Sequence, residues 1–369
     1  MRFKFHGQLL FFVLSIFLIT SNGIPQNQNL KFKSLSSDDG LSQNFVSCII
    51  QDQKGFMWFG TKDGLNRFDG HTFLVYQHDP FDTTTISDNF ITALLEDTRG
   101  YIWVGTLNGG LNIFDRETEI FHRIHYTSNV LKTSEIDEIK SLVEDSQGNI
   151  WFGTRGEGVF KISLKKKDSF EISYAQYISN PAQSGSLSSN IVSTLFFDSK
   201  GLLWVSTLTG LDKFDFKTEK FIHYDIKTRN PEAPPNYFDG TVYSICETRN
   251  GDLWLGSLSG LVKFNRQNGN YKIFPNRYEV FRYGWGSVMQ IVEDSSGILW
   301  LATPAELMSF DPKNNLYNYI RNDPSDQYSI SYNSISSLFI DRTGILWVGT
   351  AGMGINIYDP KVNRFSIFA

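Results

Sequence analysis

The sequence has little of what metal enzymes, nucleophilic hydrolases and nucleic-acid-binding proteins use most. Only six of its 369 residues are histidine, and two are cysteine. Lysine and arginine total 34 against 39 acidic residues, and no basic face is evident, so nucleic acid is not an expected partner. The one basic run, at residues 165–167, ends at Asp168, which is typical of a solvated turn.

Long hydrophobic runs are also lacking after the first 23 residues. Arg2 and Lys4 precede eleven residues, 9–19, that are apolar apart from Ser15. Such a run is short for a membrane span and suits a signal-peptide core, which the small residues at 21–23 complete. The sequence therefore predicts a signal peptide over residues 1–23 and an exported, periplasmic chain. No cysteine follows to carry a lipid anchor.

What the sequence does contain is a repeat. A segment of the form Gly-x-x-Trp-x-Gly-Thr occurs seven times with small variations, and its copies start 45 to 53 residues apart. Its tryptophans are Trp58, Trp103, Trp151, Trp204, Trp254, Trp300 and Trp347. Self-similarity with a period of 40 to 50 residues is the signature of a propeller or an array. We expect each repeat tryptophan to be buried between neighbouring units.

Each repeat predicts four strands. Asp-x-x-Gly, as in residues 97–100, is typical of a type I turn, and the four apolar residues that follow (56–59 in the first repeat) predict a strand buried on both faces. One strand precedes the turn, and a third and a fourth follow a second glycine. Seven repeats of four antiparallel strands predict an all-β fold, a seven-bladed β-propeller over residues 24–369.

Ring closure is the uncertain element of this fold, because eight segments are candidates for seven fourth strands. Residues 31–35 and residues 365–368 compete for the last blade. Pairing the two ends of the chain removes exposed sheet edges. We therefore expect residues 31–35 to take the outer position on the last blade, with residues 365–368 displaced.

The scarce reactive residues are also poorly placed for catalysis. Cys48 and Cys246 fall in first strands of repeats one and five, which are not neighbours, so we expect two thiols rather than a disulfide. The histidines that follow the leader lie on or beside expected fourth strands, at the outside of the ring: His71, His78, His122, His125 and His223. Neither a Ser-His-Asp triad, a metal site nor a cofactor site is predicted.

The motifs resemble a known repeat family. Asp-x-x-Gly-x-Leu-Trp-Val-Gly-Thr, then Gly-Leu, then Phe-Asp, is similar to the two-component regulator propeller repeat. Residues 39–44 and 55–70 are especially similar to the start of the periplasmic sensor region of hybrid two-component sensor proteins. The resemblance covers roughly residues 30–369. It implies an oligosaccharide-sensing propeller, with a second propeller or signalling domains C-terminal to this chain as partners.

Three function classes follow. The favoured one is a non-catalytic exported sensor that recognises a glycan. The second is an exported propeller lyase or glycosidase that uses channel carboxylates. Asp63, Glu157 and Glu306 are expected in turns that could face the channel mouth, and a glycosidase needs a carboxyl pair roughly 5 to 10 Å apart. The third is a protein-interaction scaffold. The oligomeric state, a dimer included, stays open.

The ligand site is predicted around the sixth repeat. The loop at residues 276–286 is the densest cluster of aromatic residues and arginine in any connection, and it contains Trp285, which the repeat does not require. It leads into the repeat in which Glu306 replaces the second glycine. Several departures from the repeat pattern at one place favour a functional role. The aromatic side chains of this loop are equally consistent with packing that fills the channel. The candidate ligand-binding residues are Arg282, Tyr283, Trp285, Glu306, Arg155, Glu157, Tyr237 and Phe238.

Overall fold

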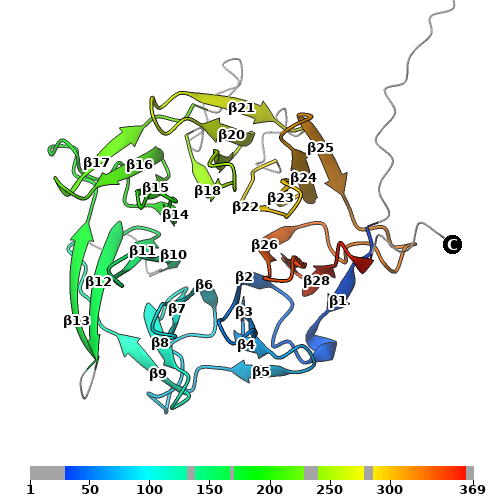
Figure 1. Cartoon of the computed structure of the whole chain (residues 1–369). Helices are drawn as coiled ribbons and strands as arrows, with labels where there is room; N and C mark the ends of the chain where they lie inside the picture. Colours follow the sequence, from blue (N-terminus) through cyan, green and yellow to red (C-terminus); the bar gives the residue numbers. More distant parts are fainter. Residues whose placement is uncertain (1–29, 131–137, 167–169, 228–239, 278–285, 363–369) are drawn as a thin grey trace, which may run out of the picture.

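The computed structural model describes residues 30–130, 138–166, 170–227, 240–277 and 286–362. These residues form seven four-stranded antiparallel sheets arranged as the blades of a ring (Figure 1). The predicted seven-bladed β-propeller is therefore confirmed. The strands are β1 (Lys33–Leu35), β2 (Val46–Gln51), β3 (Met57–Thr61), β4 (Gly64–Phe68), β5 (Phe73–Tyr76), β6 (Ile91–Glu96), β7 (Ile102–Thr106), β8 (Leu111–Asp115), β9 (Ile120–Ile124), β10 (Ile139–Glu144), β11 (Ile150–Thr154), β12 (Val159–Lys166), β13 (Phe170–Tyr177), β14 (Val192–Phe197), β15 (Leu203–Thr207), β16 (Gly210–Asp215), β17 (Lys220–Tyr224), β18 (Val242–Glu247), β19 (Leu253–Ser257), β20 (Gly260–Phe264), β21 (Tyr271–Pro275), β22 (Gln290–Glu293), β23 (Leu299–Ala302), β24 (Leu307–Asp311), β25 (Leu316–Ile320), β26 (Ile335–Ile340), β27 (Leu346–Thr350) and β28 (Ile355–Tyr358).

Each blade uses four consecutive strands, except the last. Blade 1 is β2–β5, blade 2 is β6–β9, and the pattern continues to blade 6, which is β22–β25. The first strand of each blade lines the centre of the ring and the fourth lies at its rim (Figure 1). Helix is limited, among the described residues, to one 3-10 turn, η1 (Ser37–Asp39). No helix in the described ranges is long and apolar enough to cross a membrane.

Blade 7 closes the ring with the beginning of the chain. Its strand order is β26, β27, β28 and β1, and β1 pairs antiparallel to β28 with Leu35 opposite Ile355. Leu35 is buried against Trp347 and Ile355. The prediction that the N-terminal segment takes the outer position is confirmed. The predicted displaced segment, residues 365–368, and the predicted signal peptide, residues 1–23, lie outside the described residues.

The core consists of seven clusters, one at each boundary between blades. The repeat tryptophans are all buried, and each packs on the first strand of the following blade, as Trp103 does on Ile139 and Leu142. The glycine of the motif explains how blades come this close. A Cβ at Gly60 would lie 2.8 Å from Ile91 on blade 2, so only glycine leaves the room that blade 2 occupies.

The turn aspartate has a role beyond the turn. Asp52 accepts hydrogen bonds from the Phe56 backbone N–H at 3.0 Å and from Trp58 Nε1 at 2.8 Å. The same carboxylate–indole bond joins Asp97–Trp103, Asp145–Trp151, Asp198–Trp204, Asp294–Trp300 and Asp341–Trp347. A buried indole N–H needs an acceptor, and the turn supplies it. This bond was not predicted from the sequence, where the aspartate was interpreted as a turn residue alone.

The two cysteines are thiols, as predicted. Cys48 lies on β2 and Cys246 on β18, in blades 1 and 5. Burial raises the pKa of each thiol to about 12. The thiolate, which is the reactive form, is therefore scarce at neutral pH.

Candidate ligand-binding site on the loop face of blade six

The turn between the second and third strands of each blade is held by a threonine or serine at its start. Thr350 Oγ1 accepts a hydrogen bond from the Met353 backbone N–H at 2.9 Å and donates to the Gly354 carbonyl at 2.9 Å. Blade 6 keeps this arrangement, because Thr303 Oγ1 accepts from the Glu306 N–H at 3.1 Å and donates to its carbonyl at 2.6 Å. A glutamate side chain is thereby fixed where most other blades have glycine.

Glu306 is fully buried at the start of β24. Arg277 Nη2 donates to both of its carboxylate oxygens, at 2.7 and 2.6 Å, and Arg321 Nε donates to Oε2 at 2.7 Å. Arg277 follows β21 of blade 5 and Arg321 follows β25 of blade 6. We call these three side chains the Glu306 cluster. It ties the ends of two neighbouring rim strands to one central turn.

The Glu306 cluster contains one carboxylate and two guanidinium groups. A buried carboxylate is costly unless it is paired and hydrogen-bonded, and two guanidiniums surround this one, so the three side chains carry one net positive charge. The carboxylate is inaccessible, whereas the Arg277 and Arg321 side chains are 44% and 54% exposed. Arg277 also lies over the Tyr319 ring, 3.9 Å from its centroid, which fixes the guanidinium plane. The cluster therefore presents oriented donors to solvent.

A hollow of about 370 Å³ opens beside the Glu306 cluster, between blades 6 and 7. It is lined by Pro304, Ala305, Arg321, Tyr332, Asn333 and Ser334. Tyr332 is 42% exposed and offers an aromatic face. Guanidinium donors beside an exposed ring can bind a molecule that has carboxylate or hydroxyl oxygens and an apolar face.

Of the predicted site residues, Glu306 is the one that the structure places in this cluster. The cation predicted for this region was Arg282, whereas the arginines that contact Glu306 are Arg277 and Arg321. A buried glutamate in place of glycine was the available signal, because it requires a cation nearby. Five predicted residues lie outside the described residues: Arg282, Tyr283, Trp285, Tyr237 and Phe238.

The remaining predicted pair lies on blade 3, on the opposite side of the ring from blade 6 (Figure 1). Arg155 Nη1 is 3.1 Å from Glu138 Oε2, and Lys140 Nζ is 2.8 Å from Oε1 of the same carboxylate. Glu157 is buried, and its backbone N–H donates to Thr154 Oγ1 at 2.8 Å. The structure therefore gives this pair local partners and does not join it to the Glu306 cluster.

A known family model matches the chain once in each of six blades. The model described as "two component regulator propeller" matches residues 40–63, 85–108, 135–156, 186–209, 236–259 and 329–352. These segments cover the first strand, the Asp turn and the tryptophan strand, wholly or in part, in six blades. The corresponding segment of blade 6 is not among them. The blade that departs from the family pattern is thus the one that carries the Glu306 cluster.

The chain is also similar to three proteins, one in sequence and two in structure. A histidine kinase of Formosa agariphila is 56% identical over 62 residues, which are 17% of this chain and 4% of that protein. The extracellular domain of a protein described as a hybrid two component system from B. thetaiotaomicron is 25% identical, with a TM-score of 0.72 over 89% of this chain and 42% of that one. Virginiamycin B lyase of Staphylococcus aureus, at 14% identity and a TM-score of 0.62 over 89% of this chain and 98% of its own, shares the fold. The chain spans less than half of the two sensor-type proteins.

Proposed function

Because the chain is built from the repeats of the two component regulator propeller family, we propose that it is an exported, non-catalytic propeller that senses a glycan for a two-component signalling protein. The similarity to an extracellular domain of such a system supports the sensing role. The partners of this function are further domains of the same protein, a second propeller or signalling domains, which relay the binding event.

The Glu306 cluster is the observation that carries the choice of site. A rigid ring positions two guanidiniums at 2.6–2.7 Å from one buried carboxylate, and both remain about half exposed. Guanidiniums bind carboxylates and vicinal hydroxyls through paired donors. The exposed Tyr332 ring and the adjacent hollow add the apolar surface that a sugar ring needs. An oligosaccharide with hydroxyl and carboxylate oxygens fits this combination.

A non-catalytic role is supported by the state of the same carboxylate. Glu306 already accepts three hydrogen bonds from two guanidiniums and is fully buried. A glycosidase needs one carboxyl group in contact with the glycosidic oxygen and a second in contact with water or the anomeric carbon. Glu306 is instead an anchor for the two arginines that face solvent.

The experiment is calorimetric titration of the full chain with a panel of neutral and uronate-containing oligosaccharides. Arg321→Ala removes one exposed guanidinium and leaves Glu306 paired with Arg277, so folding is retained. Loss of a charged hydrogen bond predicts binding about tenfold or more weaker. Arg342→Ala, an exposed arginine in a turn on the opposite face, is the matched control and should bind like wild type.

Three results would contradict the proposal. Equal affinity in wild type and in folded Arg321→Ala would remove the Glu306 cluster as the site. Release of reducing ends or unsaturated sugars from a bound oligosaccharide would contradict the non-catalytic role and favour the lyase or glycosidase alternative. Absence of binding by any oligosaccharide would contradict the ligand class.

A further inference from the structure

The boundary between blades 3 and 4 differs from two equivalent boundaries of the ring. Between blades 1 and 2, Arg116 Nη1 is 3.0 Å from Asp52 Oδ2, and its Nη2 pairs with Glu96 at the end of β6. Between blades 4 and 5, Arg266 Nη1 is 2.9 Å from Asp198 Oδ2 and 2.7 Å from Glu247 at the end of β18. In both cases an arginine that follows the third strand of one blade is buried against the Asp turn of the preceding blade.

The glutamate at these boundaries has a second contact. Glu96 accepts the backbone N–H of Gln53 at 2.7 Å, and Glu247 accepts that of Ser199 at 2.6 Å. Gln53 and Ser199 each follow the turn aspartate of the preceding blade. The last side chain of a first strand thus accepts an N–H from the neighbouring turn and closes the boundary.

Between blades 3 and 4, phenylalanine replaces both charged residues. Phe197 ends β14, in the place of the glutamate, and Phe216 follows β16, in the place of the arginine. The two rings are stacked, with centroids 6.2 Å apart and planes at 24°. The turn aspartate, Asp145, instead accepts a hydrogen bond from Asn149 Nδ2 at 2.9 Å. Replacement of a buried ion pair by apolar residues is energetically acceptable, so the change by itself is a packing solution.

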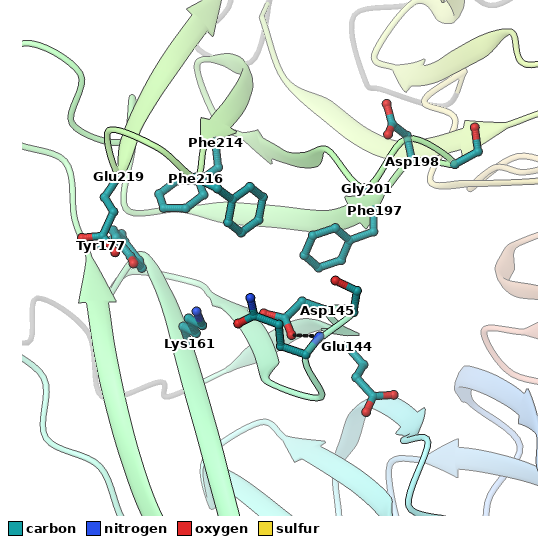
Figure 2. Close-up of a pocket in the computed structure, with 13 residues that line it drawn as sticks. Glu144, Asp145, Lys161, Tyr177, Phe197, Asp198, Gly201, Phe214, Phe216 and Glu219 are labelled. Carbon is teal, nitrogen blue, oxygen red and sulfur yellow. Dashed lines mark hydrogen bonds between the residues drawn. The ribbon is translucent and has the colours of Figure 1, made fainter.

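The packing is nevertheless incomplete. A hollow of about 570 Å³ lies at this boundary, and Phe216 is 44% exposed within it. Figure 2 shows Phe197, Phe214 and Phe216 of blade 4 on one side, with Lys161 and Asp145 of blade 3 on the other. We call this hollow the blade 3–4 groove. Two aromatic rings that served packing alone would have filled the space that the arginine and the glutamate vacate.

The groove also contains an exposed backbone donor. Ser146 follows Asp145, and its N–H is the counterpart of the Gln53 and Ser199 donors. Within the described residues this N–H has no hydrogen-bond acceptor, since Phe197 has no oxygen to offer. The same position thus combines an aromatic floor with a backbone donor whose counterparts, Gln53 and Ser199, are paired with a glutamate.

We propose that the blade 3–4 groove binds a neutral sugar ring. The C–H face of a pyranose would lie on Phe216 and Phe197, and one ring or hydroxyl oxygen would accept the Ser146 N–H. Lys161 and Gln147 line the groove and supply further polar groups for hydroxyls. A sugar ring has this division between an apolar face and a polar edge, whereas an aromatic molecule has no such edge.

The charge of the groove selects a neutral sugar over an acidic one. Four carboxylates line it, and Asp198 is paired with Arg266, so the other three face one ammonium group and give two net negative charges. The charged lining residues are Glu144, Asp145, Asp198, Glu219 and Lys161. The Glu306 cluster, in contrast, carries one net positive charge. This second site rests on the proposed glycan-sensing function for its ligand class, and it lies on the Asp-turn face, opposite the loop face.

Saturation-transfer NMR on the full chain tests the proposal, with the methyl glycosides of glucose, galactose, mannose and xylose as probes and a methyl glucuronoside as the charged comparison. Two variants change the groove. Phe216→Ala removes the exposed ring, and Phe197→Glu with Phe216→Arg introduces the ion pair found between blades 1 and 2 and between blades 4 and 5. Ile222→Ala, which removes another exposed apolar side chain (45%) of the same blade, is the matched control.

We expect saturation transfer to at least one neutral glycoside and a weaker signal from the glucuronoside. The signal should fall at least about fivefold in both groove variants and persist in Ile222→Ala and Arg321→Ala, with thermal melting confirming folded protein in each. A signal that survives in both groove variants overturns the proposal, as does the absence of signal from every neutral glycoside in the wild type. A signal lost in Arg321→Ala alone assigns binding to the loop face and also overturns it.

Discussion

The bond between the turn carboxylate and the tryptophan indole makes a quantitative prediction, because blade 5 lacks it. Trp204 is fully buried and its Nε1 donates to Asp198 Oδ2 at 3.0 Å. In blade 5, Thr248 stands in the place of the aspartate, and Trp254 is equally buried at 2% exposure. Trp204→Phe therefore removes a charged hydrogen bond and some volume, whereas Trp254→Phe removes volume alone.

The two contributions can be estimated separately. Tryptophan to phenylalanine removes roughly 40 Å³ of side chain, which costs about 1 kcal/mol at roughly 24 cal/mol per Å³ of cavity. A hydrogen bond to a charged group contributes about 1.5–3 kcal/mol. We therefore expect Trp204→Phe to cost about 2.5–4 kcal/mol and Trp254→Phe about 1 kcal/mol. Trp204→Ala, which also removes the packing against Phe264, should cost about 3–5 kcal/mol.

Urea unfolding followed by circular dichroism measures these differences, provided that the slope against urea concentration is unchanged. The comparison of the two phenylalanine variants cancels the volume contribution, so their difference reports the hydrogen bond. Equal destabilisation in Trp204→Phe and Trp254→Phe would refute the reasoning and reduce the aspartate to a turn residue.

Two further predictions concern acid stability and ring closure. The free energy of unfolding should fall as the pH drops below about 4. Burial raises the pKa of certain turn carboxylates, but the hydrogen bonds that they accept outweigh burial and hold each pKa below its ordinary value. The stability linked to a lowered pKa is present above the pKa of the unfolded state and is lost as the pH falls through the pKa of the folded state. These carboxylates are Asp145, Asp198 and Asp341. A melting temperature that is constant between pH 2 and pH 6 would contradict this. Phe32→Ala should cost about 3–5 kcal/mol, because Phe32 is buried where the N-terminal segment meets blade 7. The control, Lys33→Ala, changes an exposed residue and should alter stability by no more than about 0.5 kcal/mol. Similar urea midpoints for the two variants would contradict closure of the ring by this segment.

The fold was predictable because its determinants are local and repeated. The turn and the apolar strand recur in each copy, and the second glycine follows within about 15 residues in six of the seven, so the strand count follows without knowledge of any long-range contact. Ring closure by β1 was predictable by elimination, since eight segments competed for seven places. The Asp–Trp bond was also available in principle, because the two residues are always six apart and the turn of Trp254 alone lacks the aspartate.

The candidate sites were only partly predictable, because their members come from different blades. Glu306 was identified, since it replaces a glycine of the repeat. Arg277 and Arg321 follow rim strands of blades 5 and 6, and nothing in their local sequence indicates that both reach one carboxylate. The blade 3–4 groove was missed entirely. Phe197 and Phe216 look like ordinary apolar residues until the structure shows which charged residues occupy the same places elsewhere.

The two departures from the repeat share a feature that argues against simple decay of the pattern. A repeat that loses one partner of a buried charge pair leaves the other unpaired, which costs about 3–5 kcal/mol. At the blade 3–4 boundary neither partner of the pair between blades 1 and 2 and between blades 4 and 5 is present, and Asn149 donates a hydrogen bond to Asp145. At blade 6 a new buried carboxylate appears together with two arginines. In each case the buried polar groups remain satisfied while the exposed surface gains a new combination of rings and donors. A binding surface on a repeating scaffold requires both features, buried polar groups that keep their partners and exposed residues that differ from those of the other repeats.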